Sequence, residues 1–424
     1  MLEESQIPDG LPDPPTSLED IGLPEGFLQD LILKTLYPEG TLEGKEIATR
    51  LKLPFGNVLR DLLDRLEDEK YLEVKGGGQF AAEWDYQITE SGRSRAREIF
   101  EEDRYVGPAP VPLEQYDRVT ANFAVSDEHI THADLSRAFD DLQVPERYFD
   151  VFGPAVNSGQ SVFVYGKPGN GKSVMCERVI ESFQDSVGIP HAIFSGGSVI
   201  KVFDRYHHND HEVPDNTIDE RWNVCDRPFI SVGGELTMEE LDLIYNADIG
   251  YYEAPFQVKA NTGLLLIDDF GRQAMDPGEL LNRWIVPLEK RRDFLTLHTG
   301  QKIEVPFEVL VFYSTNLDPE DLVDEAFLRR LRYKIEATDP SRDEFRTLFR
   351  SVCQDEGLEC PEDTIDYLIE EHYEKPGRDM RRCHPRDLLE TIEDYCLYQN
   401  EDLTVNRDLL DRAAETYFPD NVLQ

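Results

Sequence analysis

A glycine-rich octapeptide, GKPGNGKS at residues 166–173, constrains this chain more than any other stretch. It fits the pattern G-x-x-x-x-G-K-[ST], in which glycines let backbone N–H groups turn toward phosphate oxygens, the lysine reaches the β- and γ-phosphates, and the hydroxyl binds Mg²⁺. The apolar residues 161–165 predict a buried strand before it, and residues 174–180 predict a helix after it. This context favours a phosphate-binding loop over an ordinary turn. The predicted nucleotide contacts are Gly166, Lys167, Pro168, Gly169, Asn170, Gly171, Lys172 and Ser173.

A second apolar run, residues 263–267 (GLLLI), ends in two carboxylates, Asp268 and Asp269. In P-loop ATPases the first acid at such a strand end helps to hold Mg²⁺, and the second orients or deprotonates the attacking water. The pattern alone is weak, but it follows the phosphate loop at a spacing that suits one nucleotide-binding domain. We therefore predict that Ser173 and Asp268 are metal ligands and that Asp269 is catalytic.

A third apolar run, residues 309–313, is followed by Ser314, Thr315 and Asn316. An amide at the tip of a strand beside the acid-bearing strand can hydrogen-bond the γ-phosphate or the attacking water. Asn316 is therefore the second predicted catalytic residue.

With these motifs in this order, the chain resembles the AAA+ ATPases over about residues 135–400. Asn316 looks like their sensor 1. The segment 326–332 (AFLRRLR) looks like the one that sends an arginine finger into a neighbouring subunit, with Arg329 and Arg330 equally good candidates. Arg386 looks like sensor 2 on a lid helix.

The resemblance implies an α/β P-loop NTPase core with a parallel sheet and a C-terminal helical lid. It also implies ATP and Mg²⁺ as cofactors and a homo-oligomer, with a hexamer favoured. The chain departs from the family at Asp269, where most members have Glu, so a slow or tightly gated ATPase is compatible with the sequence.

A predicted helix at 280–290 and alternating segments at 294–298 and 302–305 lie between the acid pair and Asn316. This helix and hairpin resemble the pre-sensor-1 insertion of MoxR-type ATPases, and the sequence Ile-Asp-Asp-Phe-Gly also resembles helicase loaders. The region 195–257 is long for the fold. Its aromatic residues Tyr251, Tyr252 and Phe256 are either pore-facing or packed against the domain, and packing is the favoured alternative.

The N-terminal part of the chain divides into three predicted segments. Residues 1–24 are acidic and proline-rich, which predicts a disordered tail. Residues 25–104 have the order of helices and strands that resembles a winged-helix domain, and residues 105–134 predict a stiff Pro-rich linker. The 25–104 segment carries 12 Lys and Arg against 18 Asp and Glu. DNA binding by this domain is therefore possible but disfavoured, and docking of protein is favoured.

The whole chain of 424 residues has a formal net charge of −43. A charge this large disfavours anionic surfaces and is typical of proteins adapted to a high-salt, halophilic cytoplasm. The six cysteines lack C-x-x-C spacing, which indicates a reducing compartment. Apolar runs fall well short of the roughly 20 residues that span a bilayer. We therefore expect a cytoplasmic protein without membrane insertion.

Together these observations predict a nucleotide-binding core at 135–340 and a helical lid at 341–424. The first function hypothesis is an oligomeric AAA+ ATPase that hydrolyses ATP to remodel or assemble an unidentified protein client, as a chaperone does. The alternative is a DNA-directed ATPase of the regulator or helicase-loader type. The third is a nucleotide-dependent switch with little turnover.

Overall fold

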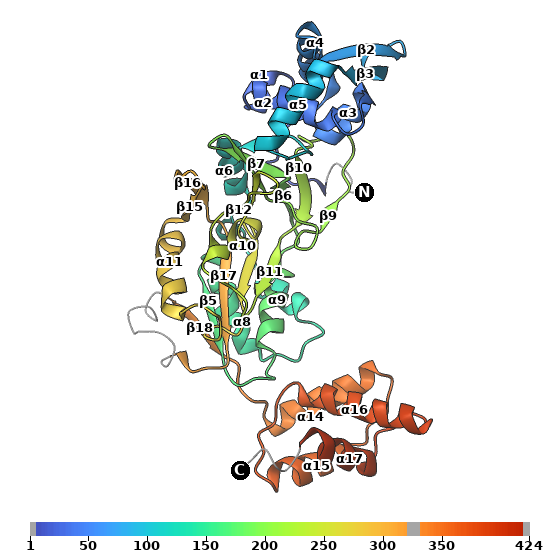
Figure 1. The fold of residues 1–424 in the computed structure, drawn as a ribbon. Helices are drawn as coiled ribbons and strands as arrows, with labels where there is room; N and C mark the ends of the chain where they lie inside the picture. Colours follow the sequence, from blue (N-terminus) through green and yellow to red (C-terminus); the bar gives the residue numbers. More distant parts are fainter. Residues whose placement is uncertain (1–5, 320–330, 419–424) are drawn as a thin grey trace.

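The computed structural model describes residues 6–319 and 331–418 (Figure 1). A five-stranded parallel sheet forms the centre of the chain, in the order β11-β14-β17-β5-β18. The phosphate-loop strand therefore lies beside the strand that carries Asn316, and that strand lies beside the acid-bearing one. The strands are β5 (Val162–Tyr165), β11 (Phe229–Val232), β14 (Leu264–Ile267), β17 (Leu310–Thr315) and β18 (Tyr333–Glu336).

Helices cover both faces of this sheet, which explains its uninterrupted apolar strands. Successive residues of β14 alternate between two clusters, with Leu264 and Leu266 in one and Leu265 and Ile267 in the other. The first cluster includes side chains of α7 (His132–Ala138), α8 (Phe149–Asn157) and α9 (Lys172–Ile180), and the second those of α11 (Pro277–Lys290). The predicted α/β core with a parallel sheet is confirmed.

The chain after β18 forms a helical lobe at the far end of the core, in orange and red in Figure 1. Its helices pack around one apolar cluster of their own. A capping box at Ser341 and Glu344 starts the first helix at the predicted boundary. The C-terminal helices expected for a lid are thus present: α14 (Arg342–Asp355), α15 (Glu362–Ile369), α16 (His384–Gln399) and α17 (Arg407–Tyr417).

The N-terminal module, which we define as residues 25–104, packs around one core and lies at the opposite end of the molecule (Figure 1). Its helices and its last two strands come in the predicted order, and a short strand, β1 (Thr41–Glu43), completes a sheet with the order β1-β3-β2. Its other elements are α2 (Glu25–Leu36), α3 (Gly44–Leu51), α4 (Arg60–Asp68), β2 (Leu72–Gly77), β3 (Trp84–Ile88) and α5 (Glu90–Glu102).

The prediction of a disordered tail over residues 1–24 is wrong for residues 6–24. The carbonyl of Gly10 accepts a hydrogen bond from Asn122 Nδ2 at 3.0 Å, and that of Pro12 accepts one from the Asp219 N–H at 2.8 Å. A capped turn, α1 (Leu18–Ile21), follows, and Ile21 is buried in the core of the N-terminal module. Composition suggested too little apolar area to order the segment, but the acceptors and the core are supplied by other parts of the chain.

The prediction of an extended Pro-rich linker over residues 105–134 is also wrong. Tyr105 is buried, and the segment contains β4 (Val111–Pro112) and α6 (Leu113–Asn122) before it reaches α7. Strand β4 pairs with β7 at the edge of a sheet, a position that tolerates proline because no ladder N–H is needed on the open side. The segment is packed structure and does not act as a spacer.

Apart from β11, which belongs to the central sheet, the region between the two nucleotide motifs forms a β-rich insertion, which we define as residues 186–226 and 244–253. An antiparallel sheet, β6-β10-β9, and a mixed sheet, β12-β13-β8-β7-β4, share one apolar core with α6 and with the predicted hairpin. The two strands of the hairpin pair from Arg292–Pro306 to Thr296–Lys302. The strands are β6 (Ser186–Pro190), β7 (Ala192–Ser195), β8 (Ser198–Lys201), β9 (Asp210–His211), β10 (Trp222–Asp226), β12 (Ile244–Asn246) and β13 (Tyr251–Glu253), with β15 (Arg292–Thr296) and β16 (Lys302–Pro306) in the hairpin.

The three aromatic residues considered for a pore, Tyr251, Tyr252 and Phe256, are packed, which agrees with the favoured alternative. Tyr252 is buried, and its hydroxyl accepts a hydrogen bond from the backbone N–H of His298 at 2.8 Å, at the tip of the hairpin. Tyr251 packs edge-on against Tyr105, with ring centroids 5.5 Å apart. The tip of the hairpin is therefore attached to the insertion.

A buried arginine joins the insertion to the N-terminal segments. The Arg221 side chain has no exposed surface, and its Nη1 donates to the carbonyls of Ile21 at 3.0 Å and Pro110 at 3.3 Å. Its Nη2 pairs with Asp219 at 2.7 Å and donates to Gln115 Oε1 at 3.2 Å. One guanidinium thus links the α1 turn, β4, α6 and the insertion.

Across residues 6–319 and 331–418, no helix is both long enough and apolar enough to cross a bilayer.

Candidate nucleotide-binding and hydrolysis site

The phosphate loop runs from the end of β5 to the first turn of α9 with a backbone that requires glycine. Gly166, Gly169 and Gly171 have φ values of 136°, 84° and 76°. A Cβ on Gly166 would lie 2.5 Å from the carbonyl oxygen of Ala337, so this glycine also permits the close approach of β18. Gly171 precedes α9, whose first N–H groups point into the loop. The predicted loop is therefore built as a phosphate cradle.

Lys172 lies inside this loop, with only 7% of its surface exposed. Its Nζ donates to the carbonyls of Gly166 at 2.9 Å and Lys167 at 3.1 Å and to Asn316 Oδ1 at 2.6 Å. Burial lowers the pKa of Lys172, and the charges of Asp268 and Asp269 oppose that shift. The lysine thus connects the loop to the tip of β17.

The two predicted acids occupy different positions at the end of β14. Asp268 Oδ2 accepts a hydrogen bond from Ser173 Oγ at 2.7 Å. Asp269 is in the left-handed region, with a φ of 47°, and its Oδ1 accepts a hydrogen bond from Asn316 Nδ2 at 2.7 Å. A non-glycine residue in this region costs on the order of 1 kcal/mol, and the turn is held by the Phe270 N–H, which donates to the Ser314 carbonyl.

The oxygen donors of Ser173 and Asp268 fit Mg²⁺, which usually takes one or two protein ligands together with substrate phosphates. In the part of the chain that the structure describes, no group of three or more His, Cys, Asp or Glu is arranged so that it could hold a metal ion. The structure therefore brings Lys172, Ser173, Asp268, Asp269 and Asn316 into one hydrogen-bonded chain, closed by the Asp269 N–H, which donates to Asp268 Oδ1 at 3.0 Å.

Of the three predicted arginines, the structure describes only Arg386. Arg329 and Arg330 lie outside the described residues. Arg386 lies on the first turn of α16, and its side chain is 67% exposed, with Glu390 3.5 Å and Asp387 3.8 Å away. It lines a cavity that also borders the phosphate loop.

This cavity has a volume of about 390 Å³ and lies between the core and the lid. That size is within the range of sites for small molecules, which is about 300–1,000 Å³. Leu142 and Val144 line it, whereas Phe139, Phe149 and Phe152 are packed in the core. Its remaining lining includes Gly169, Asn170, Gly171, Val174, Leu348, Val352, Arg382 and Cys383. The contribution of α14 and of Arg382 was not predicted, because no sequence motif marks these residues.

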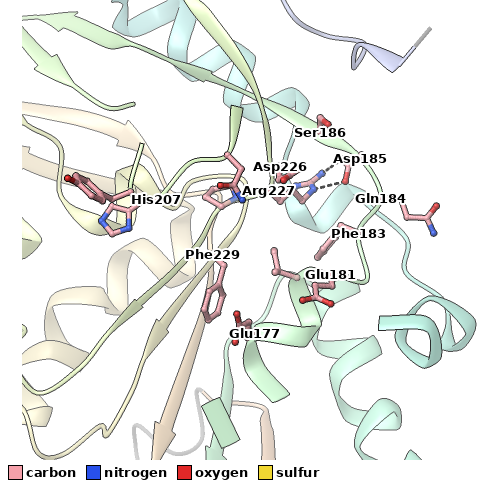
Figure 2. Close-up of a pocket in the computed structure, with 14 residues that line it drawn as sticks. Glu177, Glu181, Phe183, Gln184, Asp185, Ser186, His207, Asp226, Arg227 and Phe229 are labelled. Atoms are coloured by element: carbon pink, nitrogen blue, oxygen red, sulfur yellow. Dashed lines mark hydrogen bonds and ion pairs between the residues drawn. The ribbon is translucent and has the colours of Figure 1, made fainter. Parts of the chain in front are cut away.

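A second cavity, of about 510 Å³, lies at the other end of α9 (Figure 2). Its side chains include Glu177, Glu181, Asp185 and Asp226, and Arg227 forms an ion pair with Asp185 at 2.5 Å. This lining repels phosphate, so the smaller cavity at the loop is the better nucleotide site despite its size.

Two family models match parts of the chain. One described as "RNA helicase" matches residues 162–221, and one described as "Domain of unknown function (DUF8689)" matches residues 341–416. The first covers the phosphate loop and α9, and the second covers the lid. No curated protein matches the sequence.

Among solved structures, NtrX from Brucella abortus is similar at 15% identity over 68% of this chain and 59% of that chain, with a TM-score of 0.42. The same protein in complex with ATP gives a TM-score of 0.41 at 15% identity, with 68% and 59% covered. The Holliday junction branch migration motor RuvB from Thermotoga maritima gives 0.38 at 14% identity, with 68% and 70% covered. The chain thus spans less than two thirds of the length of NtrX.

Proposed function

We propose that this chain is an ATP hydrolase. The hydrogen-bonded chain from Lys172 through Asn316 to Asp269, beside the Ser173–Asp268 pair, is the observation that carries the proposal. It brings the charge that neutralises phosphate, the oxygen donors for a metal and the group that orients water to one edge of the sheet. Mg²⁺, when bound, neutralises charge that develops on the β- and γ-phosphates.

In the proposed reaction the loop N–H groups and Lys172 bind the phosphates, and Ser173 and Asp268 hold the metal. Asp269 orients the attacking water, and Asn316 fixes that carboxylate through its amide. Arg386, on the lid side of the cavity, contacts the phosphates from the opposite direction. Arg329 or Arg330 of a neighbouring subunit completes the site in trans within a homo-oligomer, most simply a hexamer.

We further propose that turnover moves the N-terminal module and thereby remodels a protein client. The acid-bearing turn leads into α11 and the hairpin, and the hairpin shares its core with the insertion. The insertion in turn contacts the N-terminal module, for example through Phe27 and Phe194, whose ring centroids lie 4.6 Å apart. This continuous packing supports transmission of a domain movement.

The alternative proposal, a nucleic-acid-directed ATPase, is favoured by the family match described as "RNA helicase". The local charge opposes it. Both arginines of α4 are engaged with carboxylates, since Arg60 lies 3.7 Å from Asp64 and Arg65 pairs with Glu25. We therefore place protein remodelling first. DNA binding by the full chain over a series of salt concentrations distinguishes the two proposals. If the chain contacts DNA phosphates, its affinity for DNA falls as the salt concentration rises, whereas a module that binds only a protein client shows no such DNA binding.

Hydrolysis is tested by phosphate release in high-salt buffer with the variants Lys172→Ala and Asp269→Asn. The matched controls Lys75→Ala and Asp248→Asn remove the same charges at exposed positions. We expect turnover in the wild type and both controls and its loss in both site variants. Absence of turnover in the wild type, with ATP still bound, would favour the nucleotide switch instead.

A further inference from the structure

One variable position of the phosphate loop makes contacts outside the loop. Asn170 is one of the variable positions of the G-x-x-x-x-G-K-[ST] pattern, yet only 1% of its surface is exposed. Its Nδ2 donates to Asp339 Oδ1 at 2.8 Å and to the Ala337 carbonyl at 3.2 Å. Its Oδ1 accepts a hydrogen bond from the Arg382 N–H at 3.4 Å. The amide therefore joins the loop to the end of β18 and to the residues that precede α16.

A cluster of alternating charges surrounds this amide. Lys167 Nζ lies 2.7 Å from Asp379 and 3.1 Å from Asp339, and Arg381 lies 2.7 Å from Asp339 and 3.3 Å from Asp379. Two cations and two carboxylates thus bridge the loop, the core–lid connection and the lid. Because Lys167 and Asp379 are more than half exposed, salt screens their attraction.

The backbones also meet at this joint. The Cys383 N–H donates to the Gly169 carbonyl at 2.9 Å, and a Cβ on Gly169 would lie 2.7 Å from Cys383 Sγ. Helix α16 begins at the next residue, so Arg386 follows within its first turn. Since a helix is stiff, the contact between the loop and residues 382–383 sets where Arg386 lies relative to the phosphates.

We propose that Asn170 is a positioning residue that seats the lid on the phosphate loop, so that Arg386 reaches the bound phosphates. The charge cluster of Lys167, Asp339, Asp379 and Arg381 stabilises this seat. The inference rests on the proposed hydrolysis for its kinetic consequence, but the coupling between loop and lid does not require turnover. If nucleotide binding favours the contact between loop and lid, then loss of that contact lowers the affinity for the nucleotide by the same factor.

The test combines Asn170→Ala with Arg386→Ala in the full chain. We expect Asn170→Ala to lower kcat about tenfold, because the loop loses its side-chain hydrogen bonds to the core–lid connection and the lid. The double variant should be no slower than Arg386→Ala alone, because both act through the same contact. Asn170→Asp should be slower than Asn170→Ala, because it puts a carboxylate beside Asp339. The matched control is Asn209→Ala at an exposed position.

A second readout separates failure of this inference from failure of the proposed hydrolysis. Hydrogen exchange of residues 379–388 is measured with and without a non-hydrolysable ATP analogue. We expect the analogue to slow exchange in the wild type and in Asn209→Ala but not in Asn170→Ala. The proposal would be overturned if Asn170→Ala kept both the wild-type kcat and the wild-type protection of residues 379–388. It would also be overturned if the kcat losses of the two single variants multiplied in the double variant. A wild type that shows protection without turnover would overturn only the hydrolysis.

Discussion

Replacement of Asn316 by alanine removes the link between the phosphate loop and Asp269, the carboxylate proposed to orient water. Its amide accepts from Lys172 Nζ at 2.6 Å and donates to Asp269 Oδ1 at 2.7 Å, so two short charge-assisted hydrogen bonds are lost. Loss of a partner that orients a catalytic side chain can cost up to about 10⁴ in kcat, and loss of a donor that stabilises developing charge about 10²–10³. We expect a loss of about 10²-fold in kcat for Asn316→Ala. The KM for ATP should change by less than about threefold, because the loop N–H groups and Lys172 still bind the phosphates.

The assay is steady-state phosphate release over a range of ATP concentrations, with Asn209→Ala as the control. Asn316→Asp is informative beside it, because a carboxylate cannot donate to Asp269 and repels it. We expect that variant to be at least as slow as Asn316→Ala. A kcat within about threefold of the wild type, or a large rise in KM with kcat unchanged, would refute the assigned role.

Three further predictions concern the loop, the insertion and the lid. Gly169→Ala should lower ATP affinity at least about tenfold in a binding titration, because φ is 84° at this position and the new Cβ would meet Cys383 Sγ. The control Gly197→Ala should leave ATP affinity unchanged, because Gly197 has a φ of 82° but open space around it. Arg221→Ala should lower the free energy of unfolding by about 3–5 kcal/mol in chemical denaturation, because a buried carboxylate loses its partner, and a loss below about 1 kcal/mol would contradict this. Burial lowers the pKa of His384 from 6.5 to about 4, so the unfolded chain binds the extra proton and stability should fall as the pH falls from about 6.5 to 4. His384→Gln should flatten that dependence in thermal unfolding, and an unchanged slope would count against the assignment.

The residues of the candidate nucleotide site could be predicted to lie together because their signals are local. Apolar runs such as residues 263–267 are buried on both faces of the sheet, and a short uninterrupted apolar run is typical of a central strand. Polar residues that follow such runs lie at the carboxyl edge of a parallel sheet. This places Asp268, Asp269 and Asn316 near Lys172 without any knowledge of the loops between them.

The parts that could not be predicted depend on contacts between distant segments. Residues 6–24 are ordered by partners such as Asn122 and Asp219, which no local composition reveals. The same is true of Asn170, whose partner Arg382 is far away along the chain and carries no motif. Short strands such as β12 and β13 are also difficult to predict, because three residues carry too little periodicity to be distinguished from a loop.

The most direct test measures ATP binding and phosphate release on the same sample of the Asp269→Asn variant in high-salt buffer. Asp269 is assigned to the water and not to the phosphates, so the variant should bind ATP with an affinity within about threefold of the wild type. Its single-turnover phosphate release should be slower by about 10²-fold or more. Release at the wild-type rate, or loss of binding together with release, would contradict the account of this site.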